Sequence, residues 1–228
     1  MNSFSLEKAT EKQATLIRKV YSWMTAALLI TGGVAYRVSS SEYLLSIIFS
    51  SKMSFYGLII AQLAIVWYLS ARIKSLTLVT ATILFALYSI MMGVTMSAIF
   101  LAFTQASIAS TFLITAGTFG AMSLYGYTTK KDLTSWGGFL FMGVIGIIIA
   151  SLVNMFLASS VFELIISYVG VLIFVGLTAY DTQKIKALLE NQDNDEQGQK
   201  LALLGSLTLY LDFINLFMFL LRIMGSRK

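Results

Sequence analysis

Long apolar stretches recur along the chain, each near the length of about 20 residues that a helix needs to cross the apolar core of a bilayer. Charged or loop-forming residues separate these stretches. The pattern predicts an all-α polytopic membrane protein, a single membrane domain over residues 1–228 with an amphipathic lead at 1–19 and a polar loop at 188–200. Seven transmembrane helices are expected, at about Val20–Val38, Ser54–Ala71, Leu76–Phe103, Ser107–Tyr127, Leu133–Ala158, Val161–Lys184 and Leu201–Leu221.

The composition limits the chemistry that this chain can perform. Of its 228 residues 57% are hydrophobic and 12% charged, whereas soluble domains carry about 25% charged residues. Histidine, cysteine and proline are absent, which excludes disulfides, thiolate nucleophiles, imidazole chemistry and zinc sites built on Cys or His. Carboxylates, amines, hydroxyls and the backbone remain as functional groups.

The distribution of basic residues predicts the orientation in the membrane. Two basic residues, Arg37 and Lys52, lie in the loops of one side. The other side carries Lys8, Lys12, Arg18, Lys19, Arg72, Lys74, Lys130, Lys131, Lys184, Lys186 and Lys200. The amino terminus therefore faces the cytoplasm, and the net charge of +5 reflects this asymmetry rather than binding to nucleic acid. Seven crossings place the carboxyl terminus outside, unless the last segment re-enters without crossing.

Small residues suggest where helices approach closely in lipid. In the fourth predicted span they recur at Ala116 and Gly120 and at Gly117 and Ala121, and Gly143 and Gly146 mark one face of the fifth.

Two aspartates lie inside predicted spans, where an ionised group costs at least about 2.5–3.5 kcal/mol and so indicates a functional site. Asp212 lies near the middle of the last span and Asp181 near the cytoplasmic end of the sixth. Helical spacing puts each on a polar stripe, Gly205, Thr208, Asp212, Asn215, Phe219 and Arg222 in one span and Ser167, Gly170, Phe174, Thr178 and Asp181 in the other. Facing stripes would bring the carboxylates together. Alternatively, Asp181 lies in water at a helix end and a neighbouring hydroxyl satisfies Asp212.

Paired carboxylates predict a proton switch that works without histidine. At about 4 Å and an effective dielectric constant near 20, two such charges repel by about 4 kcal/mol. The pair would therefore hold one proton and release it in a second step closer to neutral pH. Arg72, at the cytoplasmic end of the second span, is the nearest candidate counter-ion, although an arginine at a helix end commonly extends to the headgroups.

The segments Gly176–Lys184 and Leu207–Phe217 resemble signatures in the last two helices of the Bax inhibitor-1 family, also called the transmembrane Bax-inhibitor-motif family. The resemblance implies a bacterial member with seven helices, the last surrounded by the other six, and a pH-sensitive calcium leak. It also implies that Asp181 and Asp212 form the proton sensor and that Arg72 matches a latch arginine.

The expected function is thus a pH-sensitive calcium or cation leak channel of a bacterial inner membrane. Calcium, the transported species, would bind weakly at Asp181 and Asp212, and no other cofactor is expected. Supporting polar groups are expected at Thr178, Tyr180, Thr208, Tyr210 and Asn215. The expected partners are the lipid bilayer, calcium ions and protons.

Three other functions are weighed. One is a non-transporting membrane regulator that binds proteases or cell-death partners, and another is a proton/calcium antiporter. An intramembrane aspartyl protease is disfavoured, because Leu209-Tyr210-Leu211 precedes the second aspartate where those enzymes carry Gly-x-Gly, and their proline motif cannot occur here. We therefore expect no enzyme.

Overall fold

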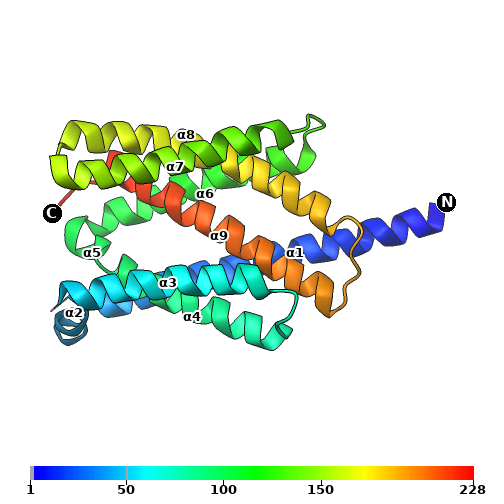
Figure 1. The fold of residues 1–228 in the computed structure, drawn as a ribbon, viewed down its shortest axis with the longest axis horizontal. Helices are drawn as coiled ribbons and strands as arrows, with labels where there is room; N and C mark the ends of the chain where they lie inside the picture. Colours follow the sequence, from blue (N-terminus) through cyan, green and yellow to red (C-terminus); the bar gives the residue numbers. More distant parts are fainter. Residues whose placement is uncertain (1–2, 50) are drawn as a thin grey trace. The chain divides into compact units, whose positions relative to one another are not determined.

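The computed structural model describes residues 3–49 and 51–228, and their side chains except those of residues 3–10, 49 and 52. The first two residues of the predicted lead, and the side chains of Lys8 and Lys52 used for the orientation, lie outside this description. Within the described ranges the chain forms nine helices and no strand, which confirms the all-α prediction (Figure 1). They are α1 (Ser3–Ser39), α2 (Glu42–Phe49), α3 (Lys52–Arg72), α4 (Leu78–Met96), α5 (Ile99–Ala102), α6 (Gln105–Thr128), α7 (Thr134–Leu157), α8 (Ser160–Leu189) and α9 (Glu196–Met224).

Six segments among the described residues are helical, long and apolar enough to cross a membrane. They are Met53–Arg72, Leu78–Ala102, Gln105–Thr128, Thr134–Leu157, Ser160–Leu189 and Glu196–Met224, and they coincide with six of the seven predicted spans. The remaining prediction, Val20–Val38, lies within α1, which is not among the six. Glycine, hydroxyl-bearing side chains and Arg37 lower the hydropathy of that stretch. The count of seven crossing helices is therefore not confirmed.

Several element boundaries differ from the sequence expectation. The amphipathic lead and the first predicted span form one continuous helix of 37 residues, α1. The third predicted span is divided into α4 and α5 at Ser97 and Ala98, where backbone bonds span three residues, as from Ala98 N to Thr95 O and from Phe100 N to Ser97 O. Ser97 Oγ also donates to Val94 O at 2.7 Å. Helices α8 and α9 extend into the predicted polar loop and leave only residues 190–195 between them.

Hydroxyl side chains begin several helices in this proline-free chain. Ser51 Oγ accepts a bond from Met53 N at 3.1 Å, Thr77 Oγ1 from Thr80 N at 3.2 Å, and Thr104 Oγ1 from Ser107 N at 3.3 Å. Each bond satisfies one of the free N–H groups at a helix start. At the other end of α7, Ala158 adopts a left-handed conformation with φ of 49° and ends the helix.

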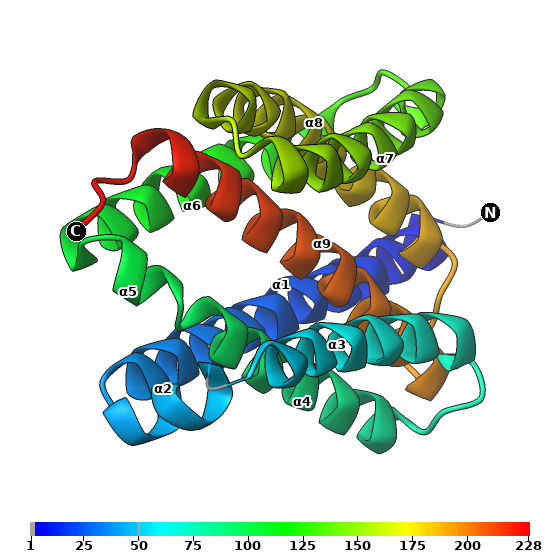
Figure 2. The same ribbon diagram turned by 60° about the vertical axis from the view of Figure 1, so that its left-hand side comes forward.

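The helices form two compact units, of which the first comprises Met1–Ala102, Leu188–Tyr210 and Lys228. In this unit α1 packs chiefly on α4, and α3 lies beside α4 (Figure 2). A Cβ added at Gly93 of α4 would lie 2.7 Å from Thr31 O of α1, so a glycine is needed where these two backbones approach. Lys200 Nζ, near the start of α9, donates to Lys74 O and Leu76 O and thereby fixes the turn before α4.

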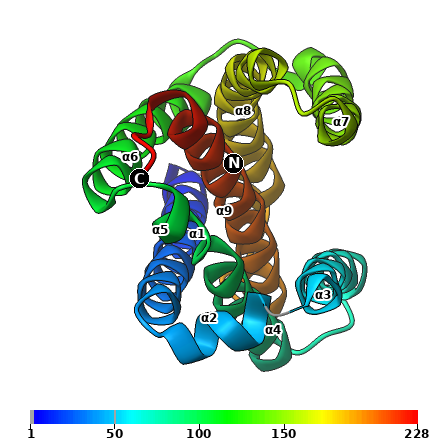
Figure 3. The ribbon, with the colours of Figure 1, turned by 90° about the vertical axis from the view of Figure 1, so that its left-hand side faces the viewer.

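The second unit comprises Phe103–Ala187 and Leu211–Arg227, and so contains α6, α7, most of α8 and the last part of α9. Helix α7 runs beside α8 (Figure 3), and a Cβ at Gly143 would lie 2.6 Å from Ile173 Cδ1. The close approach of α6 to α8 is at Gly126, where a Cβ would lie 2.2 Å from Ala179 O. Ser226 ties the chain end to α6, since its N–H donates to Ser107 Oγ at 2.9 Å.

The glycines of the second unit test the predicted packing faces. Gly143 packs closely on α8, as the small-residue pattern predicts. The predictions for Gly117, Gly120 and Gly146 are wrong, because no described neighbouring atom would lie within 4 Å of a Cβ at these positions. Small residues on a lipid-facing surface give the same sequence spacing as those in an interface, so spacing alone does not distinguish the two.

Helix α9 is the most buried of the six apolar segments. In its most apolar stretch 67% of the residues are buried, against 11–33% in the other five. Many side chains of α9 are therefore buried, and the chemistry of its polar residues depends on the groups that contact them.

Candidate functional site

Helix α8 contributes a buried polar face to the second unit. Asp181 is 8% exposed, and Thr178 and Thr182 are buried beside it. Thr178 Oγ1 donates to Phe174 O within the same helix at 2.7 Å, whereas Thr182 Oγ1 reaches Ser123 Oγ of α6 at 3.5 Å. The polar face of α8 is therefore directed partly toward α6.

Aromatic contacts set the rotation of α9 within this unit. The ring of Phe213 lies 5.4 Å from the rings of both Phe112 and Phe119 of α6, centroid to centroid. Phe219 lies 5.8 Å from Phe174 of α8, at a place where α8 carries Gly170 and offers no side chain to obstruct the ring. These contacts anchor the segment that contains Asp212 against α6 and against α8.

The structure brings Asp181 and Asp212 together. Their carboxyl groups lie within hydrogen-bonding reach and act on each other electrostatically. Lys184, one turn further along α8, is the cation that acts on Asp181. Asp212 is 5% exposed, and its Oδ2 atom has no hydrogen-bond partner among the described residues.

The unpartnered oxygen defines the chemistry of this pair. A buried polar atom without a partner costs about 1–3 kcal/mol, and more when it is charged. Two ionised carboxylates cannot bond to each other, because neither has a hydrogen to donate. A proton shared between them, or a cation held by both, would remove this cost.

Two of the predicted supporting residues accompany the pair in the second unit, and each has a local partner. Thr178 bonds within α8 as described above, and Asn215 Nδ2 donates to Leu211 O at 2.8 Å. Tyr180, one residue before Asp181, instead packs on α7, where a Cβ at Gly137 would lie 2.5 Å from its hydroxyl oxygen. Its side chain lines an open pocket at the helix ends.

The remaining predicted residues belong to the first unit. Tyr210 is fully buried and its hydroxyl lies 2.7 Å from Thr31 Oγ1, while Thr208 Oγ1 donates to Leu204 O at 3.2 Å. Arg72 lies exposed in the last turn of α3. The latch role of Arg72 and the lining roles of Thr208 and Tyr210 stay predictions.

The structure adds two residues to the surroundings of the pair, Ser123, which contacts Thr182 beside Asp181, and Lys184, which acts on Asp181 itself. Ser123 lies three residues before Gly126, the point of closest approach of α6 to α8, so a correct identification of that glycine would have indicated it. Lys184 follows Asp181 by three residues, the spacing of neighbours on one helix face, so helical spacing is the signal that indicates it. Among the described residues no group of three or more His, Cys, Asp or Glu side chains could hold a metal ion.

Comparisons with known proteins extend over nearly the whole chain. The model of a family described as "Inhibitor of apoptosis-promoting Bax1" (Bax1-I) matches residues 13–228. "Inner membrane protein YbhL" of Escherichia coli (strain K12) is 53% identical over 216 residues, which cover 94% of this chain and 92% of that protein. A Borreliella burgdorferi protein is 49% identical over 229 residues, covering 98% of this chain and 99% of the relative. A Rickettsia prowazekii protein is 48% identical over 212 residues, or 92% of this chain and 89% of the relative.

Proposed function

The chain belongs to the Bax1-I family of multi-pass membrane proteins, and from that premise we propose that it is a pH-sensitive calcium leak channel gated by Asp181 and Asp212. The observation that carries the proposal is the contact of these two buried carboxyl groups, one of which keeps an unpartnered oxygen. The inner membrane is the proposed location, as the name of the Escherichia coli relative states for that protein.

One proton has enough energetic effect to act as the switch. Removing it leaves two negative charges, which at a separation of about 4 Å and an effective dielectric constant near 20 repel by about 4 kcal/mol. A two-state equilibrium biased by that amount shifts about a thousandfold. The repulsion acts between α8 and α9, so its relief moves these helices and changes the packing around them.

Weak cation binding suits passage better than storage. Calcium takes six to eight oxygen ligands at tight sites, whereas this site offers the two carboxylates. A calcium ion would use water for its remaining ligands and leave readily, as conduction requires. In this proposal Arg72 pairs with the carboxylates in one of the two states.

Calcium flux into liposomes tests the proposal. The purified protein is reconstituted with a calcium-sensitive dye inside, and flux is measured from pH 6 to pH 8. We expect a pH-dependent rate for the wild type and a pH-independent rate for Asp181→Asn and for Asp212→Asn. Glu190→Gln, which makes the same carboxylate-to-amide change at an exposed position, should keep the pH dependence.

Three results would overturn the proposal. Unchanged pH dependence in both aspartate variants would remove the gating role of the pair. Absence of flux in the wild type at every pH would remove the channel and favour the non-transporting regulator. Uphill calcium movement driven by an imposed proton gradient would identify an antiporter instead.

A further inference from the structure

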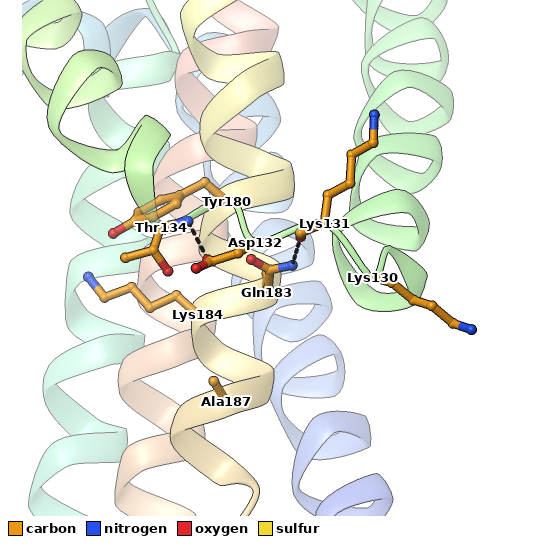
Figure 4. A pocket seen from close by; sticks show the side chains of 8 residues that line it. All are labelled: Lys130, Lys131, Asp132, Thr134, Tyr180, Gln183, Lys184 and Ala187. Carbon is orange, nitrogen blue, oxygen red and sulfur yellow. Dashed lines mark hydrogen bonds between the residues drawn. The ribbon is translucent and has the colours of Figure 1, made fainter.

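A pocket of about 480 Å³ opens where α6 ends and α7 begins, against the last turns of α8. All of its walls belong to the second unit. They are formed by Lys130, Lys131, Asp132, Thr134, Tyr180, Gln183, Lys184 and Ala187 (Figure 4). Tyr180 is one of the predicted supporting residues and Lys184 acts on Asp181, but the other six lining residues take no part in the proposed function.

The pocket carries an excess of positive charge. Lys130, Lys131 and Lys184 line it, and none of the three forms an ion pair with a described residue. Lys184 Nζ lies 5.7 Å from the centroid of the Tyr180 ring. Asp132 is the single acidic lining residue, and hydrogen bonds from Thr134 hold the pKa of its carboxyl below the usual value. Asp132 therefore stays ionised and offsets one of the three lysine charges, so the lining keeps a net positive charge.

The frame of the pocket is fixed by hydrogen bonds between α8 and the loop before α7. Gln183 Nε2 donates to Lys131 O at 2.8 Å, and Gln183 Oε1 accepts a bond from Leu133 N at 2.8 Å. Tyr180 is seated against Gly137, where a Cβ would lie only 2.5 Å from its ring. These contacts define the frame of the pocket.

The surroundings place the pocket at the boundary of the membrane. It lies at the ends of three helices that are apolar enough to span a bilayer, on the face that the basic residues assign to the cytoplasm. Just beyond it on α7, Trp136 is 57% exposed and Phe139 66% exposed. Exposed aromatic residues next to free lysines are typical of the headgroup layer, where acyl chains and phosphates meet protein together.

We propose that this pocket binds the phosphate headgroup of an anionic phospholipid. Figure 4 shows Lys184, Thr134 and Tyr180 on one side of Asp132 and Gln183, and the two loop lysines on the other. The phosphate pairs with Lys184 beside the Tyr180 hydroxyl, and Lys131 and Lys130 attract the headgroup from the opposite side. The acyl chains extend along the exposed apolar surface of α7. A free phosphate shares the anionic chemistry but lacks this apolar contact.

Quenching of Trp136 fluorescence by brominated lipid tests the site. The variant Trp23→Phe/Trp67→Phe leaves Trp136 as the reporter, since the chain has three tryptophans. It is reconstituted in phosphatidylcholine vesicles that contain equal fractions of either brominated phosphatidylglycerol or brominated phosphatidylcholine. We expect stronger quenching by the phosphatidylglycerol. In Lys131→Gln/Lys184→Gln that preference should fall at least about fivefold, the factor that corresponds to one lysine at an anionic surface.

Matched variants distinguish lipid binding in the pocket from nonspecific attraction of anionic lipid by positive charges elsewhere on the protein. Arg18→Gln/Lys74→Gln removes two exposed positive charges of the first unit and should keep the preference, as should the charge-conserving Lys131→Arg/Lys184→Arg. The proposal would be overturned if the two double glutamine variants lost the preference for phosphatidylglycerol equally, or if neither lost it. If soluble glycerol phosphate at millimolar concentration abolishes the preference, the pocket is a site for soluble phosphates and the lipid assignment is wrong.

Discussion

Two buried polar residues of α9, Tyr210 and Asp212, lie two positions apart but differ in how their oxygen atoms are hydrogen-bonded. The Tyr210 hydroxyl is bonded to Thr31 at 2.7 Å, and its ring meets those of Phe85 and Tyr88 edge to face, with centroids 5.8 and 5.9 Å away. Asp212 is also buried, yet its Oδ2 atom has no hydrogen-bond partner among the described residues. A satisfied polar group secures a fold, whereas an unsatisfied one is available to a proton or an ion.

Removal of the Tyr210 side chain should have the largest effect on stability. Tyr210→Ala deletes a fully buried aromatic side chain and leaves a cavity, for which large-to-small changes of this kind cost about 3–5 kcal/mol. We expect a loss of that size in the free energy of unfolding, measured by denaturant titration in detergent. A loss below about 1 kcal/mol would show that Tyr210 does not secure the first unit.

Asp212→Asn should act in the opposite direction and stabilise the protein at alkaline pH. The amide can donate a hydrogen bond to the ionised Asp181, and a bond to a charged group contributes about 1.5–3 kcal/mol. At acid pH the wild-type pair acquires the proton that forms an equivalent bond, so the advantage of the variant should disappear. Melting temperatures of both proteins at the two extremes of pH check this crossover, with Glu190→Gln as the neutral control.

A gain that is the same at every pH would contradict the shared proton. So would a loss of stability at alkaline pH, because it would mean that Asp212 already has a favourable partner. Either result would contradict the difference between a hydrogen-bonded Tyr210 and an unsatisfied Asp212.

The sequence predicts six of the seven spans well, because hydrophobic length is a strong local signal. Thr134–Leu157 of α7 differs by one residue at each end from the predicted Leu133–Ala158. The polar stripes on two apolar helices indicate that Asp181 and Asp212 face each other, since a carboxylate directed at lipid would have no partner. Hydrophobic length and the cost of a buried charge can both be read from the local sequence, so neither expectation needs knowledge of how the helices pack.

Other features depend on contacts that have no local signature. The continuity of α1 through the amphipathic lead and the break at Ser97 are set by packing and by bonds such as Ser97 Oγ to Val94 O. The sequence points to Gly117 and Gly120 as packing residues of α6, whereas Gly126 makes the close contact. Which glycine faces another helix depends on the rotation of α6, and spacing does not determine that rotation.

Gly126→Ala tests whether the close approach of α6 supports the position of α8 near Asp181. A Cβ at this position would lie 2.2 Å from the backbone oxygen of Ala179, which cannot move aside as a flexible side chain can. We expect a destabilisation of about 1–3 kcal/mol, typical of overpacking, measured as a change in unfolding free energy in detergent. Gly120→Ala has open space and should raise stability by about 0.5–1 kcal/mol through helix propensity. Equal effects of the two substitutions would contradict the close α6–α8 contact.

Tyr210→Phe should have the smallest effect on the free energy of unfolding. It is also the most direct test of the difference between Tyr210 and Asp212. It removes only the hydroxyl, and Thr31 Oγ1 retains Ser89 O as an acceptor at 3.0 Å, so neither partner is left unsatisfied. Interhelical hydrogen bonds in membrane proteins contribute about 0.6 kcal/mol on average, and we expect a loss of that size in unfolding free energy. The pH dependence of calcium flux should match that of the wild type. A shifted flux midpoint in Tyr210→Phe would place this hydroxyl in the proton switch, and the separation between a structural Tyr210 and a titrating Asp212 would then be wrong.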